Sequence, residues 1–330
     1  MPDSSAPGTR GPGAAAGLLL ALMLFGALAP LIANDRPILA TVSGRAVWPA
    51  LADLPIVGAW FETDLVRQVA WDLPGPGVRV LLRPPVPYSY RGVDLDEVLR
   101  PPGRRHLLGT DSLGRDLLAR VIHGTRPSLL IGLGATALAL LVGGLVGACA
   151  GLRGGLPDVV LMRLADIVAC FPPLVLALAF ITASGRGGVT VIMAAIALGR
   201  WTGTARFVRA EILRHAESDL WAAARAAGGS LPRVALRHLA PLMLPSVAVI
   251  AAFGVAHAIV LESSLSFVGL GVAPPDPSWG LILAEARPAM DAAWWPVLFP
   301  TLALVLVLGA LCLVAERAAG TSGARASTPL

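Results

Sequence analysis

The sequence has no lysine, only two tyrosines and three cysteines, and few charged residues of either sign. Charged side chains make up 14% of its 330 residues, whereas hydrophobic ones make up 55%. A soluble domain of this length needs a more strongly charged surface, so the composition excludes an ordinary water-soluble protein. The cysteines stand singly in apolar stretches, where packing is their expected role and no pair has metal-ligand spacing: Cys149, Cys170 and Cys312.

Sequence motifs for catalysis are also missing. There is no G-x-x-x-x-G-K-S/T phosphate loop, so any ATP would have to bind to another chain. No H-E-x-x-H motif, zinc-spaced Cys/His cluster or serine elbow is present. Arginine is distributed along the edges of apolar runs, which gives no support to nucleic-acid binding. We therefore expect no catalytic residue, no metal ion and no cofactor.

Long apolar runs dominate the chain, and several reach the ~20 residues that cross the hydrocarbon core of a bilayer. Pro172 and Pro173 interrupt one of these runs, and Arg206 lies near the end of the next. The first run is longer than the apolar core of a secretory signal, so we expect a retained anchor. The sequence predicts an all-α integral membrane protein with six transmembrane helices, at about 14–33, 128–150, 159–183, 188–208, 242–262 and 296–315.

The placement of arginine predicts the orientation of these spans. Segment 200–237 carries seven arginines and three acids, whereas residues 263–295 carry one arginine, Arg287. Positive charge gathers in short cytoplasmic loops, while long loops cross largely regardless of charge. We therefore predict that both termini and segment 200–237 are cytoplasmic. The predicted division is a tail and first span (1–33), an external Pro-rich region (34–127), a five-helix core (128–315) and a cytoplasmic tail (316–330).

A polar segment, 217–241, separates the last two predicted spans from the four before them. An ordered polar segment between membrane spans indicates a surface on which something docks. Its residues predict a helix at 220–227, a stop at Gly228 and Gly229, an N-cap at Ser230, and a second helix at 233–240 that runs up to Pro241.

Two interpretations of this segment are open from its residues alone. Small residues at 222–227 let a protein partner approach closely, and Arg225, Arg233 and Arg237 can pair with a partner's carboxylates. Alternatively, the segment lies on anionic lipid headgroups with Trp221 as its anchor.

The region 34–127 is rich in proline, which predicts extended and turn structure rather than a packed helical domain. Trp48, Trp60 and Trp71 are candidates for the membrane interface, where tryptophan is often found.

Near the end of this region lies the motif GTDSLGRD. Thr110 or Asp111 is expected to cap a helix that starts near Ser112, with Asp116 in its first turns. Asp111 and Asp116 could also be considered a catalytic carboxylate pair. Five residues apart, they do not share a helical face, and no nucleophile is nearby, so we do not favour that hypothesis.

Asp166, His257 and Glu262 are the candidates for functional groups inside predicted spans, where a charge costs about 2.5–3.5 kcal/mol on insertion scales. Asp166 and Glu262 lie near span ends, so we expect water or neighbouring backbone to satisfy them. His257 lies one turn deeper, and we expect a packed, hydrogen-bonded side chain. The alternative is that these groups line a substrate path. The break at Pro172 and Pro173 fits either a gated pore or a simple kink.

Four stretches together resemble the permease subunits of ABC importers of the dipeptide/oligopeptide/nickel class, in particular the second permease of the usual pair. They are GTDSLGRDLLARVIHGTRPSL (109–129), LMRLADIVACFPPLVLALA (161–179), AAARAAGGSLPRVALRHLAP (222–241) and ESSLSFVGLGVAPPDPSWG (262–280). The resemblance covers roughly 105–315 and the first span. It implies the ABC type I importer permease fold, with a large external loop after the first span.

In that family, segment 217–241 is similar to the so-called EAA loop, whose short coupling helix sits in a cleft of the ATP-hydrolysing subunit. Ala223, Ala224, Gly228 and Pro241 match the Ala, Ala, Gly and Pro positions of the loop. The expected coupling surface also includes Trp221 and Arg225.

The sequence departs from the EAA pattern at two positions. Ala222 stands where the family usually has the glutamate that names the motif, and Ala240 stands where leucine is common. We expect one polar contact to the ATPase to be missing, unless Glu217 or Asp219 replaces it.

The resemblance implies alternating access in the inner membrane of a bacterium. A second homologous permease completes the translocation path, two ABC ATPases drive it, and an extracytoplasmic substrate-binding protein, met by the external stretch 263–295, delivers the solute. Dipeptides, longer peptides, nickel chelates and other small solutes are all compatible. The alternative, an ATP-independent secondary transporter or channel, predicts inverted repeats and paired intramembrane charges, which the sequence lacks. A membrane-bound enzyme or scaffold is disfavoured because no reactive constellation is present.

Overall fold

A computed structural model describes residues 12–55, 57–71, 75, 77–185, 187–216 and 218–326 of the chain. Glu217, one of the two candidates to replace the missing carboxylate, lies outside the described residues. So do the side chains of Asp219, Ala224 and Arg225 and the ends of the two predicted tails.

Most of the chain is helical. The helices are α1 (Pro12–Ala27), α2 (Ala29–Ile32), α3 (Gly58–Phe61), α4 (Asp64–Gln68), α5 (Leu117–Arg153), α6 (Gly155–Ala169), α7 (Pro173–Ser184), α8 (Val189–Ala216), α9 (Asp219–Ala226), α10 (Leu231–Val234), α11 (Ala240–Phe267), α12 (Trp279–Ala286) and α13 (Trp295–Ala326). The strands are β1 (Leu39–Val42), β2 (Arg45–Val47) and β3 (Val78–Leu82). Short 3-10 turns occupy Pro49–Asp53, Leu95–Glu97 and Arg287–Ala289, and one π-helical turn, Ala235–Leu239, joins α10 to α11.

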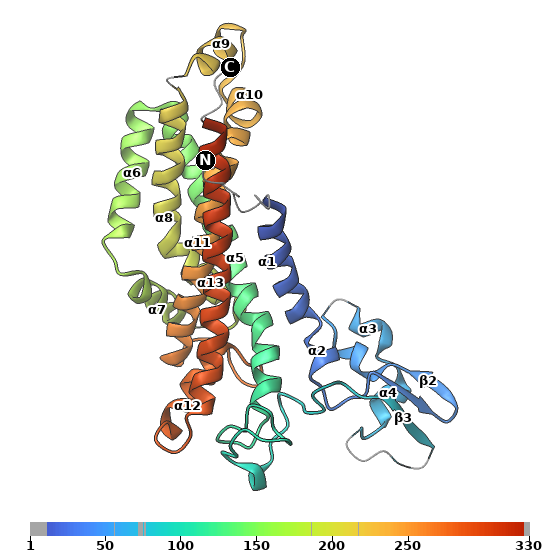
Figure 1. Cartoon of the computed structure of the whole chain (residues 1–330). Coiled ribbons are helices and arrows are strands. Elements are labelled where there is room, and N and C mark those ends of the chain that lie inside the picture. Colours follow the sequence, from blue (N-terminus) through green and yellow to red (C-terminus); the bar gives the residue numbers. More distant parts are fainter. Residues whose placement is uncertain are drawn as a thin grey trace, which may run out of the picture.

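The long helices form an elongated bundle with distinct ends (Figure 1). Helices α5, α8, α11 and α13 run along its length, and α6 lies on one side. Helices α9 and α10 lie at one end, while α12 lies at the other, with the small sheet to the side of that second end. The polar segment 217–241 and the region 34–127 are therefore at opposite ends of the molecule.

Glycines on α5 let α8 pack at very close range. A Cβ on Gly143 would lie 2.4 Å from the carbonyl oxygen of Trp201, and a Cβ on Gly147 would lie 2.4 Å from that of Ala205. Small residues four apart are typical of close helix pairs in membranes, where backbone packing replaces the hydrophobic driving force. The adjacent Gly144 faces open space, so the close packing is confined to one face of α5.

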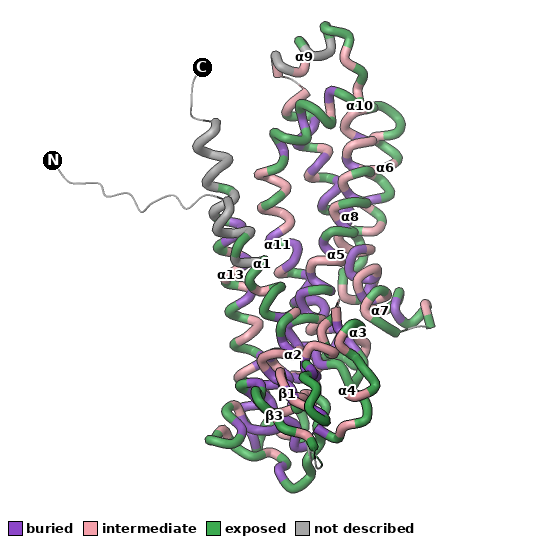
Figure 2. Tube along the Cα trace, turned by 90° about the vertical axis from the view of Figure 1, so that its right-hand side faces the viewer, coloured by how far each residue is buried: buried purple, intermediate pink, exposed green. Residues whose placement is uncertain are grey.

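Buried residues gather where the long helices meet (Figure 2). A cluster that joins α5, α7, α8 and α11 includes Ile131, Ile196 and Leu265. Large apolar side chains elsewhere on the bundle stay exposed, such as Leu145 at 65% and Leu306 at 72%. An apolar exterior around helices that satisfy their own backbone hydrogen bonds is what a lipid environment requires.

The structure tests the span prediction only in part. Among the described residues, three helices are long and apolar enough to cross a bilayer: Leu117–Arg153, Leu231–Phe267 and Trp295–Glu316. Helices α6 and α7 add a fourth candidate if taken together, since they are bent by 88° at residues 170–172. The break predicted from Pro172 and Pro173 is therefore present, whereas the count of six spans stays a prediction.

The region 34–127 contains a small antiparallel sheet with strand order β2-β1-β3, in agreement with the extended structure predicted for it. Ala40 of β1 lies opposite Val47 of β2 and Val80 of β3. Apolar side chains of the sheet pack with Val66 and Trp71 into a separate core. Trp71 is only 6% exposed and its indole N–H donates to the Val66 carbonyl oxygen (3.1 Å), so its predicted place at a membrane interface is wrong.

Candidate functional site

Helix α9 begins at a tight turn out of α8. The backbone N–H of Trp221 donates to the Ser218 carbonyl oxygen (3.0 Å) and lies 3.4 Å from the Ser218 hydroxyl, which itself donates to the His215 carbonyl oxygen (2.6 Å). A hydroxyl in this position satisfies backbone groups that a helix start leaves unpaired. Helix α9 ends at Ala226, within one residue of the predicted end.

The Trp221 side chain packs α9 against the helical bundle. Its half-buried ring packs against a cluster that contains Ile212 of α8, Leu239 of the π-helical turn and Met243 of α11. A displacement of α9 therefore acts directly on both long helices that flank it in the sequence.

The outer surface of α9 consists of small, exposed residues. Ala222, Ala223 and Gly228 are all exposed, and Gly228 has a φ of +81°, in the left-handed region that favours glycine. Next to them is a hollow of about 410 Å³, lined by Ala223, Ala227, Gly228, Gly229, Arg233, Val234 and His238.

The second predicted helix, 233–240, is present, but its predicted end at Pro241 is wrong. Helix α10 starts at Leu231 and continues through the π-helical turn into α11, so the helix is uninterrupted from Leu231 to Phe267. Pro241 lies two residues after the π-helical turn, inside this continuous helix, and it is exposed. Ser230 occupies the N-cap position, although its side chain forms no capping hydrogen bond.

Ion pairs stabilise the bundle beneath α9. Two nitrogens of the Arg209 guanidinium group, Nε and Nη2, donate to the Asp158 carboxylate (2.5 and 2.6 Å), which joins α8 to α6. Buried Glu211 accepts hydrogen bonds from Arg214 and from the Ser246 hydroxyl (3.3 Å), the second of which joins α8 to α11. Bidentate arginine–carboxylate contacts fix geometry as well as distance. The ends of α6, α8 and α11 next to α9 are therefore held together by polar contacts.

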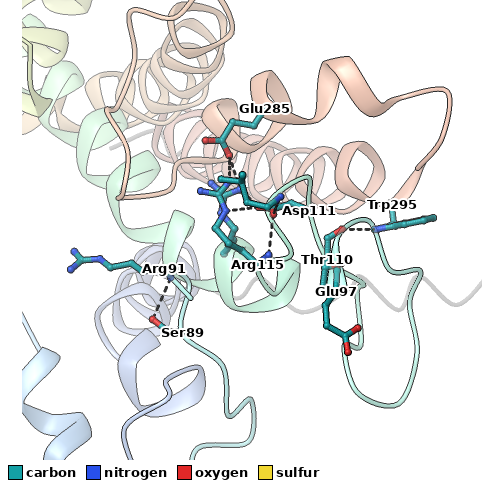
Figure 3. Close-up of polar contacts among 10 residues, drawn as sticks. Ser89, Arg91, Glu97, Thr110, Asp111, Arg115, Glu285 and Trp295 are labelled. Carbon is teal, nitrogen blue, oxygen red and sulfur yellow. Dashed lines mark hydrogen bonds and ion pairs between the residues drawn. The ribbon is translucent and has the colours of Figure 1, made fainter. Parts of the chain in front are cut away.

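At the opposite end of the bundle, the motif GTDSLGRD holds a buried cluster of charges. Asp111 accepts hydrogen bonds from Arg115 Nε (2.7 Å) and Arg120 Nη1 (2.6 Å), and Glu285 of α12 accepts one from Arg115 Nη2 (2.6 Å). Figure 3 shows Arg115 between Asp111 and Glu285. Arg120 Nη1 also lies 2.7 Å from Glu285 Oε2. Two carboxylates thus compensate two buried guanidinium groups, as buried charges require.

The motif turns before the helix starts, so the predicted cap at Thr110 or Asp111 is wrong. The Asp111 carboxylate accepts the backbone N–H groups of Leu113 (2.9 Å) and Arg115 (3.0 Å), which closes a turn through Gly114 at φ +69°. Helix α5 begins only after this turn.

Asp116 is the residue that caps α5. Its carboxylate accepts the backbone N–H of Ala119 (2.7 Å) and lies 2.8 Å from the imidazole Nδ1 of His106. Asp111 and Asp116 therefore have separate structural partners, and the carboxylate-pair hypothesis gains no support.

Of the three ionisable candidates in the predicted spans, Glu262 and His257 differ from expectation. Asp166 is half-exposed and pairs with Arg206 (2.9 Å). Glu262 is fully buried, where we expected water or backbone, and it accepts a hydrogen bond from the Ser266 hydroxyl (2.7 Å). The packed, hydrogen-bonded environment expected for His257 is also wrong, because this side chain is exposed and lines a cavity of about 460 Å³.

Comparisons with known proteins agree on one family. Residues 128–327 match the model of the binding-protein-dependent transport system inner membrane component family. The chain is 37% identical over 236 residues (70% of this chain, 78% of the relative) to the di/tripeptide transport system permease protein DppC of Pseudomonas aeruginosa. It is 35% identical over 229 residues (69% and 78%) to the oligopeptide transport system permease protein OppC of Mycobacterium bovis.

A solved structure shares the fold. A chain of the MetNI methionine ABC transporter in an inward-facing conformation superposes with a TM-score of 0.54 at 16% sequence identity, over 62% of this chain and 97% of that one.

Proposed function

This chain belongs to the family of binding-protein-dependent transport system inner membrane components, and we propose that it is the second permease of an ATP-driven importer of peptides or similar small solutes. The family makes it an integral inner membrane protein of an ABC transporter that works with ATPase and substrate-binding partners. The proposed complex contains this chain, a second homologous permease, two ATPase subunits and an extracytoplasmic binding protein. The partner ATPases hydrolyse the ATP.

The form of segment 217–241 is the observation that supports ATPase docking. Ala222 and Ala223 are exposed on a short helix at the end of the bundle, and the chain turns sharply at Gly228 beside a hollow. Small side chains let a partner surface come close to the backbone, while Trp221 transmits force to α8 and α11. Ala223, Ala224, Arg225, Gly228 and Pro241 form the proposed coupling surface with Trp221.

The proposed orientation places both termini and α9 in the cytoplasm and the sheet of region 34–127 outside. In this orientation the arginine-rich end of the bundle faces the cytoplasm, in agreement with the positive-inside rule. Residues 1–33, 34–127, 128–315 and 316–330 then serve as first span, external region, permease core and cytoplasmic tail.

Alternating access is the proposed mechanism. When the two ATPases close on ATP, they displace α9, and contacts of Trp221 carry the displacement to α8 and α11. Ala222 is exposed where the family usually has glutamate, so the substitution removes a contact to the partner without disturbing the fold of α9.

Purification of the tagged chain from its native membrane tests this proposal. We expect two ATPases and a second permease to co-purify, and we expect proteoliposomes of the complex with its binding protein to take up tri-alanine only with ATP. Uptake by this chain alone, without companion chains or ATP, would instead identify a secondary transporter or channel. Labelling of Trp221 from the outside of intact cells would overturn the orientation.

A further inference from the structure

A cavity lies where α7, α8 and α11 meet, beside the break between α6 and α7. Its volume is about 460 Å³, and among the described residues Arg200 and His257 are its ionisable lining groups. Phe171 and Phe253 add aromatic walls. A concave site with apolar walls and a few convergent polar groups is typical of small-molecule binding.

Both ionisable groups lie far from the ends of their helices. At 1.5 Å per residue, Arg200 is about 17 Å along α8 from Val189, and His257 is about 15 Å along α11 from Phe267. The hydrocarbon core of a bilayer is ~30 Å thick, so this level is close to its middle. An arginine at that depth is costly, and such residues face a bundle interior or a water-filled cavity and mark a substrate pathway.

Arg200 has no carboxylate partner among the described residues. Of the two acids of the adjoining helix α6, Asp158 is paired with Arg209, and Asp166 is paired with Arg206 (2.9 Å) and lies 3.7 Å from Arg163. Glu262 of α11 binds the Ser266 hydroxyl instead. The positive charge of Arg200 is therefore uncompensated by the part of the chain that the structure describes.

A glycine on α11 lets the Arg200 guanidinium group approach that helix. Its Nη2 lies 3.7 Å from the position that a Cβ would take on Gly254. The hydroxyl of Thr136 on α5 lies 3.4 Å from the same position, is buried, and has no hydrogen-bond partner among the described residues. Arg200 of α8 thus reaches the surface of α11, the helix that supplies His257 to the same cavity.

We propose that this cavity binds a carboxylate of the transported solute, with Arg200 as the anchoring cation and His257 as a second donor. A guanidinium group offers two parallel N–H donors that match a carboxylate. The aromatic walls then receive an apolar side chain of the same solute. This proposal rests on the proposed function, because it assigns the cavity to the translocation path.

The first experiment measures the charge of the cavity with a cysteine reporter. Gly203 lines the cavity and a Cβ there meets nothing within 4 Å, so Gly203→Cys introduces a thiol without a clash. The three native cysteines are replaced by serine, and the full transporter complex is placed in nanodiscs, where both faces are accessible. The labelling rates of anionic sulfonatoethyl and cationic trimethylammonioethyl methanethiosulfonate are then compared.

We expect Arg200→Gln to lower the ratio of anionic to cationic labelling by about tenfold, because one uncompensated charge dominates the local potential. Arg206→Gln is the matched control, since Arg206 lies on the same helix, is paired with Asp166 and does not line the cavity. It should leave the ratio within about twofold. A ratio unchanged by Arg200→Gln would overturn the proposal. That result would mean that an acid of the second permease neutralises Arg200.

The second experiment tests for a carboxylate ligand. Tri-alanine at millimolar concentration should slow the reaction of the Gly203→Cys variant with the neutral reagent N-ethylmaleimide several-fold, whereas tri-alanine amide should not. Arg200→Gln should abolish this protection, and Arg206→Gln should preserve it. Equal protection by both peptides, or none by either, would overturn the carboxylate assignment. These results do not depend on ATP, so their failure is separate from a failure of ATP-driven uptake.

Discussion

The Nη2 atom of Arg115 lies 2.6 Å from Oε2 of Glu285, which connects residues 170 positions apart in the chain. The contact joins the motif before α5 to helix α12 and closes the charge cluster that Asp111 and Arg120 complete. The Arg120 side chain is only 1% exposed. A buried pair of this kind adds little compared with apolar residues, but loss of one partner leaves a buried charge uncompensated.

We therefore predict that Glu285→Ala lowers the free energy of unfolding by about 3 kcal/mol. Thermal unfolding of the purified chain in detergent measures the change. Asp276→Ala is the matched control, because Asp276 forms an exposed pair with Arg91 (3.0 Å) at the same end of the molecule. That variant should cost less than ~1 kcal/mol. Equal losses from the two variants would contradict a special role for the buried cluster.

Adjacent glycines on α5 should respond differently to the same substitution. Gly143→Ala places a methyl group 2.4 Å from the Trp201 carbonyl oxygen, so α5 and α8 must separate at a cost of about 1–3 kcal/mol. Gly144→Ala meets no atom within 4 Å and should be neutral or slightly stabilising. Unfolding of both variants in detergent checks the difference. Similar stabilities would mean that the helices do not pack as closely as the structure shows.

The left-handed backbone at Gly228 predicts that asparagine is tolerated better than valine at this position. Valine is strained at a φ of +81°, whereas asparagine tolerates this conformation, and neither side chain meets a neighbour within 4 Å of its Cβ. The strain of valine at this φ is about 1–2 kcal/mol, so Gly228→Val should reduce uptake by at least tenfold. Gly228→Asn should retain most of the uptake. The measurement is ATP-driven uptake by the reconstituted complex, with membrane insertion as the control. Normal uptake by the valine variant would argue against coupling through this turn.

The two contacts of Asp116 can be separated by substitution. Asparagine keeps an oxygen that can cap α5, so Asp116→Asn removes only the charge that faces His106. Asp116→Ala also removes the cap and should cost about 1 kcal/mol more. The melting temperatures of the two variants give the comparison. If asparagine destabilises as much as alanine, the contact with His106 outweighs the cap.

Local sequence signals predicted the parts of the site that depend on local chemistry. The break at Pro172 and Pro173 and the end of α9 before Gly228 follow from residues that restrict or free the backbone at that position. Pro241 misled the prediction because the helix continues past it, from α10 through the π-helical turn into α11.

Other features depend on contacts that no local pattern encodes. Helix α5 starts at Leu117 and not near Ser112, because the Asp111 carboxylate closes a turn there and is held by Arg120. Glu285 lies in an ordinary helical stretch, and only the fold brings it to Arg115. The arginine pattern places Arg200 with the cytoplasmic arginines, whereas its place in one cavity with His257 depends on how α8 packs against α11.

The continuous helix formed by α10, the π-helical turn and α11 is longer than the span predicted from the sequence, and its length has a mechanical consequence. From Leu231 to Phe267 the helix runs for 37 residues, or about 55 Å, without a stop. A continuous helix of that length acts as a lever, with its π-helical turn and Pro245 as the points at which it can bend: when one tip is pushed, the opposite tip swings. The fulcrum would be where Ile259 nests against Gly132 of α5, a point at which added bulk would jam the stroke.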